Sequence, residues 1–327
     1  MTVIDVHTHF LPEEYLDTLA DLDRPVGVEY HDGERFLSIP HGTIPMPDGF
    51  TDVEERIRWM DSNGIDKTAF SISTPNPNEA PFSEEESIQL VKALNDGFAA
   101  VRSAHPDRFL AMGAIPFRDP EEALAELDRI TGDLGLDGVT LPTSVRDQIL
   151  SDPDFAPIFE RLDELNLPAF MHPRRNALSD EMERTEEYMN PLAIFPSETT
   201  IQVCRLLFNG FFDSYDFPLV VAHLGGTLPY LAGRLERGRR VYSGSDEPPE
   251  RPVIDYLSDF YYDSISFHPP AIRAAIETVG VDRLVLGTDY PFVVGDFDET
   301  AEAIEAAIPD EADRKMVYGE TAERLFS

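Results

Sequence analysis

Two histidines near the start of the chain, His7 and His9, stand two residues apart at the end of the apolar run Val3-Ile4-Asp5-Val6. Side chains two residues apart on a strand point to the same face, about 7 Å apart along it. Two imidazoles on one face, at the mouth of a buried strand, can hold a metal ion between them. Because an isolated His-x-His is more often structural than metal-binding, the pair needs support from the rest of the chain.

Three later apolar runs also end on a residue that can ligate a metal. They are Phe170-Met171-His172, Val220-Val221-Ala222-His223 and Val285-Leu286-Gly287-Thr288-Asp289. Three neutral nitrogen ligands and one carboxylate are thereby available, from His7, His9, His172 and Asp289. Borderline divalent ions such as Zn²⁺ favour this mixture, and water bound to such an ion ionises near neutral pH to become a nucleophile. The sequence therefore predicts one divalent ion as cofactor, Zn²⁺ by preference.

His223 and Asp5 receive other roles. His223 comes from the strand that follows His172, and it can face the bound water as general base or act as an electrostatic partner of the attacked oxygen. Asp5 shares a face with His7 but lies deeper, so we expect it to accept a hydrogen bond and orient a neighbouring ligand. A lone histidine at a strand end is more often a satisfied polar group; several at successive strand ends favour a site.

Short apolar strands alternate with amphipathic helices along the whole chain, which is typical of parallel βα units. The predicted strands begin near Val3, Lys67, Arg108, Gly138, Pro168, Pro218, Phe260 and Arg283. Eight such units predict a single (β/α)₈ TIM-barrel domain over residues 1–327, with catalysis at the C-terminal ends of the strands. The candidate ligands end strands one, five and eight, and His223 ends strand six.

Two segments interrupt this alternation. Residues 12–50 contain proline, glycine, acids, His31 and His41, and we expect a cap or small hairpin over the site. Residues 174–196 follow strand five and should also overhang it. Elsewhere, Thr51-Asp52-Val53-Glu54 predicts a capping box for a helix that Gly64 closes. Further helices are predicted over residues 121–130, 157–165, 198–211 and 311 to about 325.

The net charge is extreme, because 26 basic residues face 62 acidic ones, giving −36. Such a surface repels nucleic acid and anionic membranes, and molar salt screens this repulsion. The composition resembles that of haloarchaeal cytoplasmic proteins, so a halophilic protein is expected. Cys204 is the only cysteine, and no signal peptide or membrane-length apolar run is evident. We therefore expect a soluble, cytoplasmic protein.

Lysine is scarce, and its positions bear on the number of metal ions. No lysine lies between Lys92 and Lys315, so predicted strand four, residues 138–141, has none. Binuclear sites on this kind of barrel commonly use a carbamylated lysine from that strand as a bridge. One metal ion is therefore favoured, although a carboxylate could bridge instead.

The chain resembles the amidohydrolase superfamily, within it the amidohydrolase-2 branch typified by α-amino-β-carboxymuconate-ε-semialdehyde decarboxylase. The segments that carry the resemblance are Ile4-Asp5-Val6-His7-Thr8-His9, Arg56-Ile57-Arg58-Trp59-Met60-Asp61, Pro196-Ser197-Glu198-Thr199-Thr200, Ala222-His223-Leu224-Gly225-Gly226 and Leu286-Gly287-Thr288-Asp289-Tyr290-Pro291-Phe292. The resemblance implies a single Zn²⁺ on the four ligands named above, with His223 as the acid/base residue. It also implies that Arg234 reaches a neighbouring subunit's site to bind a carboxylate, which makes the active unit at least a dimer.

Two departures from the branch concern the substrate. The decarboxylase that typifies the branch has a substrate-binding arginine in the insertion after strand one, where this chain has Phe36-Leu37-Ser38-Ile39-Pro40. It also has a tryptophan after the strand-five His-Pro, where Arg174 and Arg175 stand here. We hypothesise that Arg174 supplies a bidentate carboxylate clamp. The alternative is that both arginines only balance nearby acids on the loop.

These observations favour a metal-dependent decarboxylase of a small unsaturated or aromatic carboxylate, assembled as a homodimer. A metal-dependent hydrolase of a lactone, amide or cyclic ester is the second interpretation, because the same activated water can attack a carbonyl. A zinc-stabilised binding protein without turnover is the third. The sequence does not identify the substrate.

Overall fold

The computed structural model describes residues 2–22, 24–39, 42–79, 81–146, 148–175, 188–242 and 249–327. Eight parallel strands form its central sheet: β1 (Ile4–His9), β5 (Lys67–Ser71), β6 (Phe109–Gly113), β7 (Gly138–Pro142), β10 (Ala169–His172), β11 (Leu219–Val221), β12 (Tyr261–Asp263) and β13 (Leu284–Val285). Parallel bridges from Asp5 to Leu286 and from Thr8 to Tyr290 join the last strand segment to the first. The predicted (β/α)₈ barrel is confirmed, and each strand begins at or next to the predicted residue.

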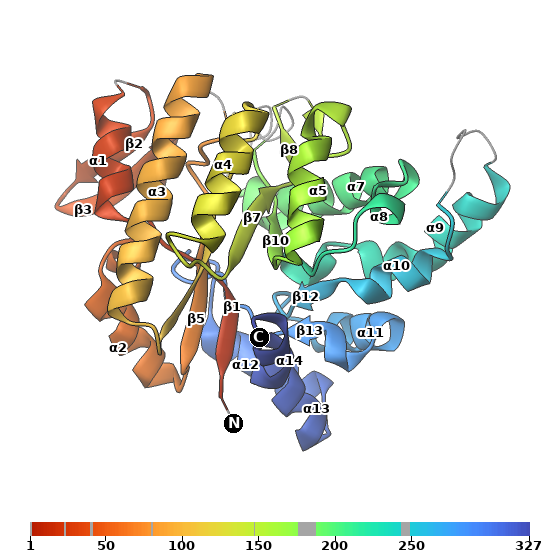
Figure 1. Cartoon of the computed structure of the whole chain (residues 1–327). Helices are drawn as coiled ribbons and strands as arrows, with labels where there is room; N and C mark the ends of the chain where they lie inside the picture. The colour runs from red at the N-terminus through yellow and green to blue at the C-terminus, as the bar shows by residue number, and fades with distance from the viewer. Residues whose placement is uncertain are drawn as a thin grey trace.

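Helices surround the strands (Figure 1). The longer ones are α2 (Val53–Asn63), α3 (Glu84–Ala104), α4 (Pro120–Thr131), α5 (Ala156–Leu165), α7 (Phe195–Phe208), α9 (Leu228–Val241), α11 (Pro269–Val279) and α12 (Phe297–Ala307). Shorter ones are α8 (Phe211–Ser214) and α10 (Val253–Asp259). The predicted final helix consists of α13 (Glu311–Lys315), the π turn η6 (Met316–Glu320) and α14 (Thr321–Leu325). None of the described helices is long and apolar enough to cross a membrane.

Two predicted helix boundaries were wrong. The helix expected over residues 198–211 begins at Phe195 and ends at Phe208, and Gly210, at a φ of 73°, separates it from α8. The N-cap of α2 is Asp52, whose side chain accepts from the amide of Glu55 at 3.0 Å. Thr51 is instead the C-cap of the preceding 3₁₀ turn, where its amide donates to the Asp48 carbonyl at 2.9 Å. Gly64 closes α2 in the left-handed conformation, as predicted.

The segment after strand one is larger than a hairpin. It holds α1 (Glu13–Asp21), which packs against α3, and an antiparallel sheet of β2 (Gly27–His31), β3 (Glu34–Ile39) and β4 (Gly42–Pro45). Figure 1 shows α1, β2 and β3 together at one side of the barrel. The 3₁₀ turn η1 (Asp48–Phe50) ends the segment, and the Leu11 amide donates to the Phe50 carbonyl at 2.7 Å. That this segment caps the site remains a prediction.

The structure describes only some of the remaining residues of the segments 12–50 and 174–196. His31 is exposed and contacts Glu29 at 3.1 Å. His41 lies outside the described residues, and so do residues 176–187 of the second excursion. The second excursion is described again from Tyr188 and leads through η3 (Asn190–Ile194) into α7.

An apolar cluster of strand residues lies beneath the candidate site. It contains Val6, Met112, Phe170 and Val220, all essentially inaccessible to solvent. The Phe170 ring touches the imidazole of His7, with 4.7 Å between ring centroids. A larger apolar core fills the space between the barrel and its helices. The polar strand ends are therefore held on a densely packed floor.

Candidate metal centre

Four side chains meet at the C-terminal end of the barrel strands. His7 and His9 come from β1, His172 is the last residue of β10, and Asp289 follows β13. All four are buried, and their ligand atoms lie within 4.8 Å of one another. These are the residues predicted from the sequence, and their convergence supports a single divalent-metal site.

The separations between ligand atoms suit one ion. The Nε2 atoms of His7 and His9 are 3.1 Å apart, and the Oδ1 atom of Asp289 lies 3.0 Å from His9 Nε2 and 3.5 Å from His7 Nε2. Ligand atoms at about 2.0–2.2 Å from a shared ion stand about 3 Å from each other. The separations among His7, His9 and Asp289 therefore suit a small divalent cation.

Hydrogen bonds on the outer side of each ring fix which nitrogen faces the centre. The Nδ1 atom of His7 contacts Asp263 Oδ2 at 2.6 Å, that of His172 contacts the Pro173 carbonyl at 2.9 Å, and that of His9 contacts Ser71 Oγ at 3.3 Å. A carboxylate or carbonyl accepts a proton from Nδ1, which leaves a lone pair on Nε2. Lone pairs facing one another repel, and a cation between them removes that repulsion.

The electrostatics of the four residues agree with this arrangement. Burial lowers the pKa of His9 to about 4, although Asp289 opposes the shift. Burial and the neighbouring imidazoles lower the pKa of His172 well below its usual value. Burial alone would raise the pKa of Asp289, but His223 and His9 hold it well below the usual value. Neutral imidazoles and an ionised carboxylate are the forms that bind a metal.

His223 lies beside the cluster rather than within it. Its Nε2 atom is 3.9 Å from Asp289 Oδ2, and its ring centroid is 5.1 Å from that of His7. Its Nδ1 atom is buried and has no hydrogen-bond partner among the residues that the structure describes. Burial alone would lower the pKa of His223, but the contact with Asp289 raises it. His223 is thus placed to exchange a proton with a molecule held at the centre.

Asp263 was missed by the sequence analysis. It ends β12, and besides His7 it accepts from the amides of His223 at 2.7 Å, Leu224 at 2.8 Å and Ile265 at 3.0 Å. His223 and Leu224 both have positive φ, at 56° and 53°, and the Asp263 carboxylate holds this turn. The signal that marked the ligands, a polar residue closing an apolar strand, is also present in Tyr261-Tyr262-Asp263.

Asp5 orients main chain rather than an imidazole. Its Oδ1 atom accepts from the amides of His7 at 3.1 Å and Thr288 at 3.2 Å, and its Oδ2 atom accepts from the Thr288 hydroxyl at 2.6 Å. It therefore connects β1 to the residue before Asp289. Burial raises the pKa of Asp5 to about 7, although the bonds from Thr288 oppose the shift.

The two predicted substrate-binding arginines lie in different places. Arg174 donates from Nε to the Ser144 carbonyl at 2.6 Å, from Nη1 to the Arg175 carbonyl at 2.6 Å and from Nη2 to the Arg146 carbonyl. Among the described residues, these bonds leave one N–H on each Nη atom without a partner. Arg234 is exposed on α9, which extends away from the barrel (Figure 1), and no contact between it and the four ligands is found in the described part of the chain.

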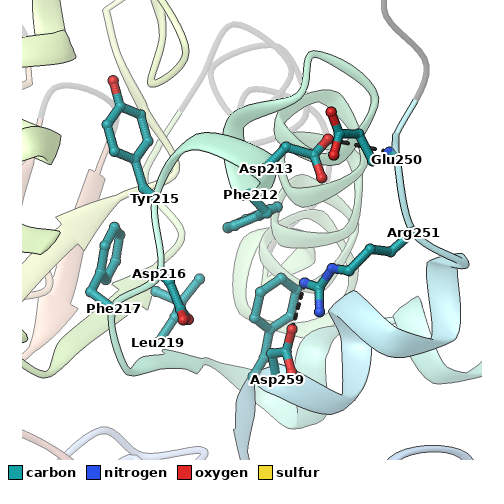
Figure 2. Close-up of a pocket in the computed structure, with 10 residues that line it drawn as sticks. Phe212, Asp213, Tyr215, Asp216, Phe217, Leu219, Glu250, Arg251 and Asp259 are labelled. Carbon is teal, nitrogen blue, oxygen red and sulfur yellow. Dashed lines mark hydrogen bonds and ion pairs between the residues drawn. The ribbon is translucent and has the colours of Figure 1, made fainter.

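A cavity of about 350 Å³ lies away from this centre (Figure 2). It sits beside the starts of β11 and β12, at the opposite ends of these strands, and shares no residue with the metal cluster. Four of its lining residues are acidic, and its one arginine, Arg251, pairs with Asp259 at 2.6 Å. We assign it no part in the chemistry of the centre.

The fold and site define a class: a (β/α)₈ barrel with one buried divalent-metal site of three histidines and an aspartate. Residues 4–327 match a family model described as Amidohydrolase, and the chain belongs to this family. β7, the fourth barrel strand, carries no lysine, in keeping with a single ion.

Similar proteins agree with this assignment. The 2-amino-3-carboxymuconate-6-semialdehyde decarboxylase of Dictyostelium discoideum is 29% identical over 308 residues, which cover 90% of this chain and 82% of that protein. The gamma-resorcylate decarboxylase of Rhizobium radiobacter is 29% identical over 307 residues, which cover 90% of this chain and 91% of that protein. A dihydroxybenzoic acid decarboxylase from Polaromonas, crystallised with manganese and the inhibitor 2-nitroresorcinol, has a TM-score of 0.81 and 26% identity, covering 99% of this chain and 96% of that one.

Proposed function

We propose that this protein is a metal-dependent, non-oxidative decarboxylase of a small aromatic or unsaturated carboxylate. The observation that carries the proposal is the buried cluster of three histidines and Asp289 with a further histidine, His223, beside it. The names of the similar proteins, which are decarboxylases of carboxymuconate semialdehyde and of dihydroxybenzoic acids, support this reaction over hydrolysis.

Aromatic side chains beside the metal ligands favour a planar substrate. The Phe292 ring lies edge-on to the His9 imidazole, with 5.2 Å between centroids, and Phe50 lies edge-on to Phe292 at 5.0 Å. Such an edge can contact the face or rim of an aromatic ring. Ortho-hydroxybenzoates are planar and carry a hydroxyl oxygen next to the carboxylate, so they also offer two oxygens to a metal ion.

The reaction needs a proton at the carbon that loses its carboxylate. When bound, the divalent ion supplies a Lewis acid that holds substrate oxygens and stabilises negative charge. His223 holds a proton at Nε2 and delivers it to the ring carbon that bears the carboxylate. The bond between that carbon and the carboxylate then breaks, its electron pair restores the ring, and CO₂ leaves. Asp289 Oδ2, 3.9 Å from His223 Nε2, keeps the imidazole turned toward the centre.

Within this proposal the ion is Zn²⁺, because three imidazoles and one carboxylate suit a borderline ion. The Polaromonas structure contains manganese, so both ions belong in the test. Metal-stripped protein is reconstituted with Zn²⁺ or Mn²⁺ and assayed with hydroxybenzoates, including 2,6-dihydroxybenzoate. We expect one equivalent of CO₂ for each substrate consumed. Acid formation from lactones or amides without CO₂ would instead establish a hydrolase, and no turnover on either panel would favour a binding protein.

We further propose that the active unit is a homodimer in which Arg234 binds the carboxylate of a substrate in the neighbouring subunit. Its exposure on α9 leaves it available to a second copy of the chain. The test mixes two variants that are inactive on their own, His223→Ala and Arg234→Ala. Hybrid dimers contain one intact site if the arginine acts across the interface, so mixing restores activity. Mixtures that stay inactive, or a monomer in light scattering, would contradict it.

Arg174 as a carboxylate clamp also stays a proposal. The two N–H groups not used by main-chain carbonyls are the ones available to a substrate. Arg174→Lys is expected to raise KM with little change in metal content, because lysine cannot reproduce the planar fork. A loss of stability with an unchanged KM would show that Arg174 only braces the loop.

A further inference from the structure

Arg56, on α2, is the only lysine or arginine that is fully buried in the described part of the chain, with 0% of its surface exposed. No carboxylate lies within ion-pair distance of it among the described residues. Burying a guanidinium without an anionic partner is costly, and among the described residues the Nε atom of Arg56 also has no hydrogen-bond partner. We therefore infer the role of the buried Arg56 charge from the groups that it contacts.

The guanidinium donates hydrogen bonds to β1 beside the metal ligands His7 and His9. Nη1 donates to the Thr8 hydroxyl at 3.0 Å, and Nη2 donates to the carbonyl of His9, itself a ligand. Nη2 also reaches the Gly49 carbonyl at 3.2 Å, where the segment after strand one returns to the barrel. The side chain thus ties two separate segments of main chain together.

The same group contacts the residue that follows the last ligand. Its central carbon lies 5.0 Å from the ring centroid of Tyr290 and 5.5 Å from that of Phe10, so it sits between two aromatic rings. The Tyr290 ring stacks on the ring of Trp59, which lies on α2 with Arg56, at 3.7 Å between centroids. The Tyr290 carbonyl accepts a hydrogen bond from the His9 amide at 2.8 Å. Arg56 therefore contacts the main chain of His9 directly, and it contacts Tyr290, the residue that follows Asp289.

We propose that Arg56 is a positioning residue of the metal centre, which fixes the separation of His9 and Asp289 by holding the main chain of one and the neighbour of the other. It complements Asp5, which performs the same task for His7 and Thr288. The proposal rests on the metal site of the proposed function. It adds that the geometry of the site depends on a side chain that touches neither metal nor substrate.

The test measures metal binding rather than turnover. Metal-stripped wild type, Arg56→Lys and Arg56→Met are titrated with Zn²⁺ against a chromophoric chelator. Loss of an outer partner of a ligand typically weakens metal binding by about 10- to 100-fold, and we expect Arg56→Met in that range and Arg56→Lys near its lower end. Arg58→Met is the matched control, since Arg58 lies on the same helix, is exposed and bonds to Glu55.

Melting temperatures separate positioning from simple stabilisation. Binding stabilises a protein according to the ratio of free ligand to Kd, so a weakened site gives a smaller rise in Tm on adding Zn²⁺. A purely structural Arg56 would lower the Tm of both forms equally and leave Kd unchanged, which would overturn the proposal. If Arg56→Met does not fold, Arg56→Lys and Thr8→Val test the proposal instead, because each removes hydrogen bonds between Arg56 and β1. A wild-type Kd for Zn²⁺ in both variants would overturn the proposal. If wild type itself binds no Zn²⁺, the metal site fails rather than the role of Arg56.

Discussion

Replacing Asp263 by asparagine should weaken metal binding without replacing a ligand. The carboxylate accepts from four N–H groups: His7 Nδ1 and the amides of His223, Leu224 and Ile265. Contacts with His7 hold the pKa of Asp263 below its usual value although burial alone would raise it, so it is an acceptor at both oxygens. Asparagine has one acceptor and one donor in the same space.

Either orientation of the new amide is unfavourable. If its oxygen faces His7, its NH₂ group faces the amides of Leu224 and Ile265, and two buried donors lose their acceptor. Each such loss costs about 1–3 kcal/mol. If its NH₂ group faces His7, the imidazole proton moves to Nε2, and that nitrogen can no longer bind a cation. We expect metal affinity to fall by about 10- to 100-fold, which corresponds to about 1.4–2.7 kcal/mol.

Chelator competition on metal-stripped Asp263→Asn measures this change, and circular dichroism checks that the barrel is folded. Asp259→Asn provides the control, because it removes a half-exposed carboxylate that pairs only at the surface, with Arg251. Surface pairs of this kind contribute about 0–1 kcal/mol. A folded Asp263→Asn protein whose Kd stays within about twofold of wild type would refute the assignment of the His7 tautomer.

Three further outcomes are expected. His223→Ala should keep its metal while kcat falls by about 10²–10⁴; elemental analysis showing loss of the metal would make His223 a ligand instead. Burial raises the pKa of Glu79 from the usual 4.5 to about 7, so its contribution to stability is complete below pH 4.5 and is lost as the pH rises to about 7. Glu79→Gln should therefore gain stability relative to wild type over that interval, by up to about 3 kcal/mol in urea unfolding, and a difference independent of pH would contradict this. Transfer from about 2 M to about 0.1 M salt lengthens electrostatic screening from a few Å to about 10 Å and should lower Tm, given the charge of −36; an unchanged Tm would reject halophilic adaptation.

The barrel and the ligands were predictable because both follow from local patterns. Each strand is a short apolar run, and in a parallel barrel the residues that close such runs meet on one rim. His172 and Asp289 could therefore be placed beside His7 although they are far away in the sequence. The same pattern occurs at Asp263, but His7, His9, His172 and Asp289 already make up a complete ligand set, so the pattern alone assigned Asp263 no role.

The rest depends on contacts that no local pattern encodes. β2 is mostly exposed, and β3 has only two buried residues, Leu37 and Ile39, so the three-stranded sheet was foreseen only as a cap or small hairpin. The environment of Arg174 depends on where the Ser144 and Arg146 carbonyls point, which is a property of the folded loop. Arg56 was visible only as part of a family motif, and its burial between Phe10 and Tyr290 follows from packing.

The ligands also determine when during synthesis the centre can exist. His9 and Asp289 are 280 residues apart, and the bridges from Asp5 and Thr8 to the segment after β13 form only when both have left the ribosome. A nascent chain that ends before residue 289 carries the histidines but lacks the carboxylate. An ion that binds after this point links the first strand to the segment after the last one and stabilises the closed barrel there. Loss of the ion should therefore loosen this seam of the barrel before any other.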